Sequence, residues 1–179
     1  GDLLNFNGQV CARNADLLRN FDVRVDLGLD GVDVLDVEKR IVAFSTELDS
    51  PFATFTAGDV LITNGGIIPN LALVFPFGID YNIGLDEVKF MGKIEDILRF
   101  VEFVRENGPD SLLEGKLQSV MQEFNIDIWF TVEGTFMRDQ RPILDGDLLS
   151  ATGTVIRTQA DLFVAAIPAG IPQRGVDFG

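Results

Sequence analysis

Short hydrophobic runs, separated by Asn-Gly and other glycine turns, predict β-hairpins at three places in the chain. Around Asn7–Gly8, β-prone residues flank an Asn-Gly pair, which is a strong local signal for a two-residue hairpin turn. Asn64–Gly65 repeats this arrangement, and Thr152–Gly153 is a weaker version of it. A glycine at each turn suits a backbone position with positive φ.

The three predicted hairpins belong to one block of eighteen residues that occurs three times. The copies are Gly1–Leu18, Gly58–Phe75 and Gly146–Phe163, and the first and third are identical at nine positions. A repeated unit this small cannot bury its own apolar face and must pack on its copies. We therefore expect the hairpins to share one apolar interior in a single domain spanning residues 1–179.

The similarity extends beyond the hairpins. Val25–Asp30 parallels Tyr81–Asp86, and Val176–Gly179 matches the start of the same segment. Two strand-like runs, Ile41–Glu47 and Ile126–Glu133, precede the second and third blocks, and their apolar residues alternate between faces. A full unit is therefore predicted to contain four strands, which is the size of a β-propeller blade.

The predicted fold class is mainly β, built from repeated four-stranded antiparallel units. The units are residues 1–57, residues 58–91 together with 124–145, and residues 146–179 in part. Two complete units and two halves are fewer than a propeller ring usually contains. A propeller-like arrangement and a pseudo-threefold barrel or sandwich therefore both stay open. Unpaired terminal strands would pair with a partner chain or with another copy in a homo-oligomer.

Residues 92–123 interrupt the second unit with a different pattern. Lys93–Asn107 places its apolar residues on one helical stripe, and Gly108–Pro109 ends that helix. Ser111 and Glu114 have the spacing of a capping box for a second amphipathic helix. We interpret the segment as an inserted helical hairpin, which either covers an edge of the β core or forms a lid over a ligand pocket.

The composition excludes several classes of chemistry. The chain has no histidine, so it lacks Ser-His and Cys-His nucleophile pairs and imidazole metal ligands. Its formal net charge of −14 disfavours nucleic acid and anionic membrane surfaces as partners. The chain has no run of eighteen apolar residues, so no membrane insertion is predicted.

The single cysteine and the first residue bear on the compartment. Cys11 lies in a strand-like run, and we expect it to be a buried, inert thiol that forms no intramolecular disulfide. A glycine at the first position is compatible with the removal of a signal peptide. We therefore expect an exported bacterial protein in an extracellular, periplasmic or cell-surface location.

Carboxylates are the remaining candidates for a functional site. Asp26, Asp30 and Asp33 lie in the densest acidic stretch, and their spacing matches the first half of a calcium-binding loop. The twelfth position of that loop is Val37 instead of a glutamate, which argues against an EF-hand. The three aspartates are therefore candidate ligands of an irregular calcium site, and the alternative is a solvated acidic loop.

Asp2, Asp59 and Asp147 follow the glycine that opens each block. We expect each carboxylate to accept backbone N–H bonds in the turn that enters the strand. The alternative is that the three aspartates coordinate a cation near the axis of the repeats.

Two functions are compatible with this sequence. The favoured hypothesis is a non-catalytic repeat domain that acts in binding or as a structural scaffold, with calcium as its candidate cofactor. The alternative is a carboxylate-dependent, glycosidase-like hydrolase with a pocket under the helical hairpin. Its acid and base would come from Glu47, Glu133 and Asp139, and Trp129 is the candidate ligand-binding aromatic residue.

Overall fold

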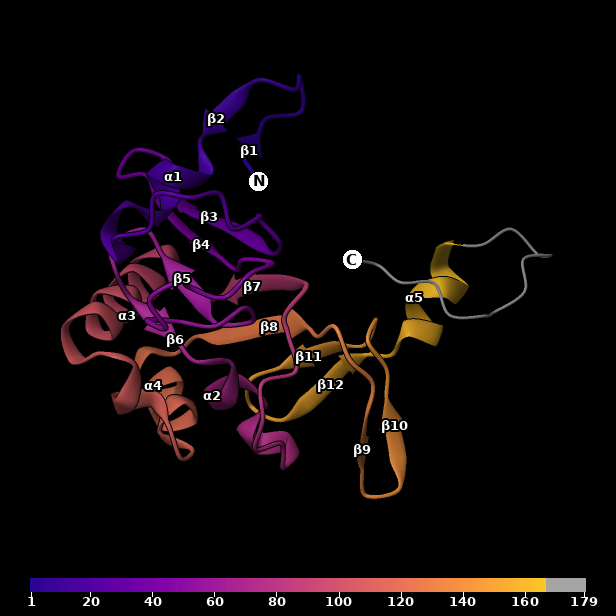
Figure 1. The fold of residues 1–179 in the computed structure, drawn as a ribbon. Helices are drawn as coiled ribbons and strands as arrows, with labels where there is room; N and C mark the ends of the chain where they lie inside the picture. Colours follow the sequence, from indigo (N-terminus) through magenta and orange to yellow (C-terminus); the bar gives the residue numbers. More distant parts are fainter. Residues whose placement is uncertain (167–179) are drawn as a thin grey trace.

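The computed structural model describes residues 1–166, which form a mainly β fold with a few helices (Figure 1). Their strands pair antiparallel in two four-stranded and two two-stranded sheets. The prediction of a mainly β, antiparallel fold is therefore confirmed. The described residues form neither a closed barrel nor a closed propeller ring. Val176–Gly179, interpreted above as the start of a further unit, lies outside the described residues.

The first four-stranded sheet has its strands in chain order. It contains β3 (Val32–Asp36), β4 (Ile41–Phe44), β5 (Val60–Ile62) and β6 (Ile67–Ile68). Phe44 of β4 lies opposite Leu61 of β5. Gly65, in the turn between β5 and β6, has a φ of +97°, as the Asn-Gly turn signal predicts.

The second four-stranded sheet has the same strand order with longer connections. It contains β7 (Glu87–Met91), β8 (Asp127–Thr131), β11 (Leu148–Ser150) and β12 (Thr154–Arg157). Leu149 of β11 lies opposite Phe130 of β8. Helices connect β7 to β8, and a ribbon of β9 (Phe136–Arg138) and β10 (Arg141–Ile143) connects β8 to β11 (Figure 1).

The connection between β7 and β8 contains α3 (Ile94–Asn107), the 3-10 turn η3 (Pro109–Leu112) and α4 (Lys116–Phe124). The predicted capping box does not form. Ser111 lies in η3, where its Oγ donates to the carbonyl of Gly108, and α4 begins after Gly115. A glycine with positive φ therefore turns the chain into α4, in place of a side-chain cap. None of the helices in residues 1–166 is long and apolar enough to cross a membrane.

Each eighteen-residue block forms a hairpin followed by a short helix. In the first block, the hairpin of β1 (Leu3–Leu4) and β2 (Val10–Ala12) precedes α1 (Asn14–Leu17) and the 3-10 turn η1 (Leu18–Phe21). In the second block, β5 and β6 precede α2 (Asn70–Val74) and the 3-10 turn η2 (Phe75–Phe77). In the third block, β11 and β12 precede α5 (Gln159–Ala166).

The β1–β2 hairpin is a separate two-stranded sheet that projects from the rest of the molecule (Figure 1). Cys11, on β2, is exposed, so the expectation of a buried thiol is wrong. The physical reason is that this sheet has only two strands, and most of their residues remain accessible to solvent.

Two hydrophobic clusters take the place of the single apolar interior expected from the repeats. Phe44 and Leu61 belong to a smaller cluster with Leu18, whereas Ala43 and Ile62 belong to a larger one that includes the helical connection. The sheet of β3 to β6 separates the two clusters, because neighbouring residues of a strand point to opposite faces.

Strands β3 and β7 lie side by side and connect the two four-stranded sheets. Asp33 of β3 is 5% exposed, and it accepts hydrogen bonds from Lys89 Nζ at 2.7 Å and from the backbone N–H of Phe90 at 2.8 Å. Bonds of this kind compensate for burying the carboxylate and hold the two strands at one register. The loops that enter β3 and β7 are consequently neighbours.

Candidate metal centre

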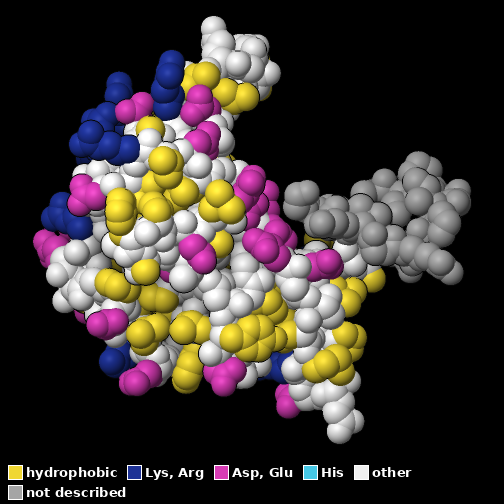
Figure 2. All heavy atoms as spheres, in the orientation of Figure 1, with side chains coloured by type: hydrophobic (Ala, Val, Ile, Leu, Met, Phe, Trp, Pro, Cys, Tyr) yellow, Lys and Arg dark blue, Asp and Glu magenta, His cyan; other side chains and the backbone are white. Residues whose placement is uncertain are grey.

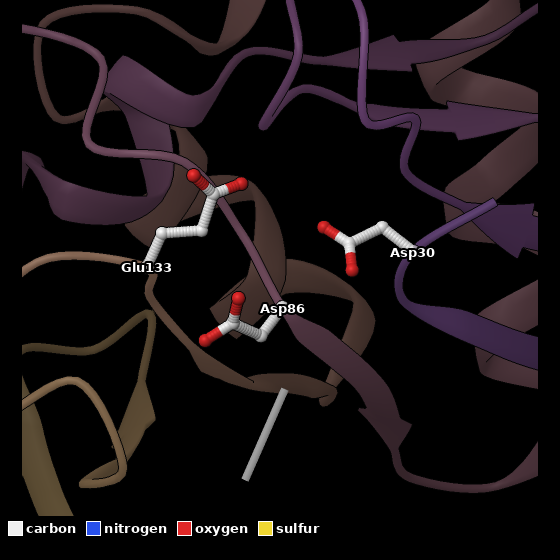
Figure 3. Close-up of side chains that lie close together, drawn as sticks. All are labelled: Asp30, Asp86 and Glu133. Carbon is white, nitrogen blue, oxygen red and sulfur yellow. The ribbon is translucent and has the colours of Figure 1, made fainter. Parts of the chain in front are cut away.

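Three carboxylates from three separate segments meet where these loops are neighbours. Asp30 lies in the loop before β3, Asp86 directly precedes β7, and Glu133 follows β8. One oxygen of each carboxylate lies within 4.8 Å of the others. Figure 3 shows the three side chains pointing toward a common space, and Figure 2 shows acidic side chains gathered on the corresponding side of the molecule. We call these three residues the carboxylate cluster.

The two aspartates are placed by the same backbone contact. The N–H of Asp30 donates to the carbonyl of Ser45, and the N–H of Asp86 donates to the carbonyl of Thr131, both at 3.3 Å. Each bond extends the strand pair that follows, β3 with β4 and β7 with β8. Because β3 and β7 are neighbours, the two equivalent aspartates come together at the start of the two sheets.

Glu133 reaches the carboxylate cluster across a glycine. Gly84 has a φ of +80°, and a Cβ atom there would lie 2.7 Å from Glu133 Oε2. Gly28, with a φ of +77°, has the same relation to Glu47, whose side-chain carbons would lie 2.7–2.8 Å from an added Cβ. Glycine is therefore required at both positions for two reasons: the backbone has a positive φ, and the glutamate side chain fills the space that a Cβ atom would need.

The negative charges of the cluster act on one another. Burial is the main cause that raises the pKa of Asp30 to about 7, and the neighbouring charges of Asp86, Glu133, Glu47 and Glu87 contribute in the same direction. A carboxyl group with this pKa carries a proton for much of the time near neutral pH. A cation bound among the three carboxylates would have the opposite effect and keep all of them ionised.

Comparisons with known proteins add no family name to this geometry. No protein-family model, curated protein or solved structure gives a significant match to the chain.

The structure separates the three aspartates predicted as calcium ligands. Asp30 alone joins the carboxylate cluster. Asp26 binds the N-terminal amine of Gly1 at 2.7 and 2.8 Å, and this bond is the main reason that its pKa is lowered. Asp33 is held by Lys89 and Phe90, as described above. Proximity in sequence therefore identified one of the three clustered residues.

The other two members of the cluster were visible in the repeats. Asp86 occupies the place of Asp30 in the segment Tyr81–Asp86, and Glu133 occupies the place of Glu47 at the end of the next strand-like run. The repeated Gly-Leu-Asp sequence, combined with the glutamate, was the available signal. This signal identifies the cluster only if the loops before β3 and β7 are known to lie side by side.

Asp59 and Asp147 have the structural role that was expected for them, whereas Asp2, within residues 1–166, makes only the bond to the helix that follows its hairpin. Asp59 accepts the backbone N–H of Thr56 at 2.8 Å, and Asp147 accepts that of Leu144 at 3.0 Å, in the turns that enter β5 and β11. In all three blocks an oxygen of the aspartate binds the N–H of the first residue of the following helix at 2.6–2.9 Å; the donors are Asn14, Asn70 and Gln159.

Two residues of the hydrolase hypothesis, Glu47 and Glu133, both lie near Asp30 and raise its pKa, whereas Asp139 and Trp129 have other surroundings. Asp139 is exposed at the turn between β9 and β10. Trp129 donates its indole N–H to Asp127 at 2.9 Å. A surface pocket of about 600 Å³ does lie beside α4, lined in part by Gln118, Met121 and Asp127, and none of the hydrolase candidates Glu47, Glu133 and Asp139 lines it.

Proposed function

We propose that the chain is a non-catalytic scaffold in which calcium, bound at the carboxylate cluster, joins two consecutive β units. The observation that carries this proposal is the convergence of Asp30, Asp86 and Glu133 from two neighbouring sheets. Calcium takes six to eight oxygen ligands in flexible geometry, and carboxylates with loop carbonyls are its usual protein ligands. Here the cation would bridge loops that belong to different sheets.

The proposed architecture is propeller-like, with each four-stranded sheet as one unit. Two observations support it over a barrel or sandwich. The strands of both sheets follow one another in chain order, and the first strands, β3 and β7, are the ones that lie side by side. First strands that gather around an axis, with later strands further out, are the arrangement of propeller blades.

Repulsion within the cluster supplies the reason for a cation. Two unit charges about 5 Å apart repel by about 1 kcal/mol in water and about 3 kcal/mol at an effective dielectric constant of about 20. A proton on Asp30 relieves part of this repulsion, and a divalent cation turns it into attraction for all three groups. The cation would therefore stabilise the folded state, which alone holds the three carboxylates together.

The test is a calcium titration of chelator-treated protein, followed by thermal unfolding. A concentration about 100-fold above Kd stabilises the native state by about 2.7 kcal/mol, which raises Tm by about 5–10 °C for a chain of this size. Asp30→Asn should remove most of the shift, whereas Asp139→Asn, a matched change of an exposed carboxylate, should keep it. An unchanged Tm at calcium concentrations up to about 100 mM, which is about 100-fold above a Kd of about 10⁻³ M, would refute the proposal.

We further propose an extracellular, periplasmic or cell-surface location, with partners bound through strands at the ends of the chain. Calcium modules of the extracellular space bind with Kd values of about 10⁻⁴–10⁻³ M, so a cluster of three carboxylates would be occupied there even at modest affinity. The exposed hairpin of β1 and β2 supports the second part, because unpaired strand edges accept strands from partners.

A further inference from the structure

Strand β1 corresponds to β5 and β11 by its place in the repeated block. Leu4 is equivalent to Leu61 and Leu149, each of which follows Gly-Asp by two positions. In the two four-stranded sheets this leucine lies opposite a phenylalanine of the preceding strand, Phe44 for Leu61 and Phe130 for Leu149. Within residues 1–166, β1 has β2 as its one neighbour, and no strand occupies the side where β4 and β8 lie in the other sheets.

The consequence is visible in the exposure of the side chains. Leu61 and Leu149 are each 0% exposed, whereas Leu4 is 54% exposed. Phe6, at the tip of the hairpin, is 97% exposed, and Val10 of β2 is 52% exposed. Figure 2 shows hydrophobic side chains on this projecting hairpin.

The other contacts of the β1–β2 hairpin are those of a complete unit. Asp2 accepts the N–H of Asn14, and the Asn14 side chain binds the N–H of Leu27 and the carbonyl of Gly28. In the next unit Asp59 and Asn70 make the same bonds, to the N–H of Ile83 and the carbonyl of Gly84. The hairpin is therefore held in the position that the outer half of a four-stranded sheet occupies.

We propose that the free edge of β1 binds a β-hairpin of the β3–β4 kind, which completes a third four-stranded sheet. The occupant is an antiparallel hairpin whose second strand has apolar residues two positions apart on one face, as Val42 and Phe44 are in β4. This strand places a phenylalanine opposite Leu4. Main-chain hydrogen bonds to β1 supply affinity, and burial of Leu4 under the aromatic ring supplies selectivity. The inference rests on the proposed function as a scaffold of repeated units and specifies the kind of hairpin that this scaffold would bind.

The test joins a second copy of residues 29–57 directly in front of Gly1. This junction is the native one, because residues 29–57 precede Gly58 in the chain. Amide hydrogen exchange of Leu4–Phe6 is measured with chelator present, so that the outcome does not depend on calcium. We expect exchange at these amides to slow by at least about tenfold, while exchange in β5 stays unchanged. The matched control carries Phe44→Asp in the added copy and should show no protection.

Three results would overturn the proposal. One is exchange at Leu4–Phe6 that is equally fast with and without the added copy. Another is equal protection in the Phe44→Asp control. The third is a dimer of the unmodified chain that Leu4→Lys dissociates, since β1 would then pair with another β1. If the extended chain does not fold, a peptide of residues 29–47 is added to the unmodified chain at millimolar concentration. Unchanged amide chemical shifts of Leu4–Phe6 then count against the proposal.

Discussion

Replacing Asp30 by asparagine should stabilise the protein in the absence of calcium, and only above acidic pH. The folded state raises the pKa of Asp30 from 3.8 to about 7, so it binds this proton more tightly than the unfolded chain does. The favourable contribution of the protonated group is complete below about pH 4 and is lost as the pH rises to about 7. The asparagine side chain carries no charge at any of these pH values. The stability of the variant therefore does not fall with the ionisation of residue 30.

The size of the effect follows from the geometry of the cluster. Asp86 and Glu133 each place an oxygen within 4.8 Å of an oxygen of Asp30. Each pair costs between about 1 and about 3 kcal/mol, depending on the effective dielectric constant. Burial of Asp30, the larger cause of its raised pKa, adds to this cost, but Asp30 is only partly buried and solvent screens the charges, so we expect about 2 kcal/mol for burial and both neighbours together.

The assay is urea unfolding of wild type and Asp30→Asn with chelator at several pH values. The difference in the free energy of unfolding should be near zero at about pH 4 and reach about 2 kcal/mol in favour of the variant at about pH 8. Asp139→Asn serves as the control and should show no such pH dependence. A variant that is no more stable than wild type at about pH 8, or equally more stable at both pH values, would refute the argument that burial and neighbouring charges disfavour the ionised form of Asp30.

Two further substitutions test how the entry loops are held. Asn70→Ala should destabilise the fold by about 2–3 kcal/mol in urea unfolding, because it leaves the half-buried N–H of Ile83 and the half-buried carbonyl of Gly84 without the partner that the buried Asn70 side chain provides; a loss below about 1 kcal/mol would contradict this role. Gly84→Ala should cost about 3 kcal/mol from backbone strain and the clash with Glu133, and Glu133→Ala should restore part of it. Gly8→Ala, with similar φ and no neighbouring atoms, should cost only about 1 kcal/mol, and an equal cost at both glycines would exclude the clash.

The hairpins were predictable from the sequence because their signals are local. An Asn-Gly pair between β-prone residues specifies its own turn, as the positive φ of Gly8 and Gly65 shows. The short helices after the hairpins were not predicted. Asn14 and Asn70 begin them by binding Asp2 and Asp59, eleven or twelve residues earlier, and such a contact leaves no pattern in a window of neighbouring residues.

The carboxylate cluster was predictable only in part for the same reason. The acidic stretch around Asp30 was evident, and so was the parallel between Val25–Asp30 and Tyr81–Asp86. That Asp30 and Asp86 meet depends on β3 and β7 being neighbours, which is a property of tertiary packing. The expectation of a single apolar interior was wrong for the same reason. The sheet of β3 to β6 is covered on both faces and separates two hydrophobic clusters, which is also a property of tertiary packing.

The bond of Asp33 to β7 determines where the chain can change in length. Asp30 lies three residues before Asp33, and Asp86 lies four residues before Phe90, so the spacing of the two cluster aspartates is counted from one anchoring point. An insertion between residues 30 and 33, or between 86 and 90, would push one aspartate out of reach of the other. The helical connection begins after Met91, outside both of these segments. Insertions there would leave the spacing of the two aspartates from Asp33 and Phe90 unchanged.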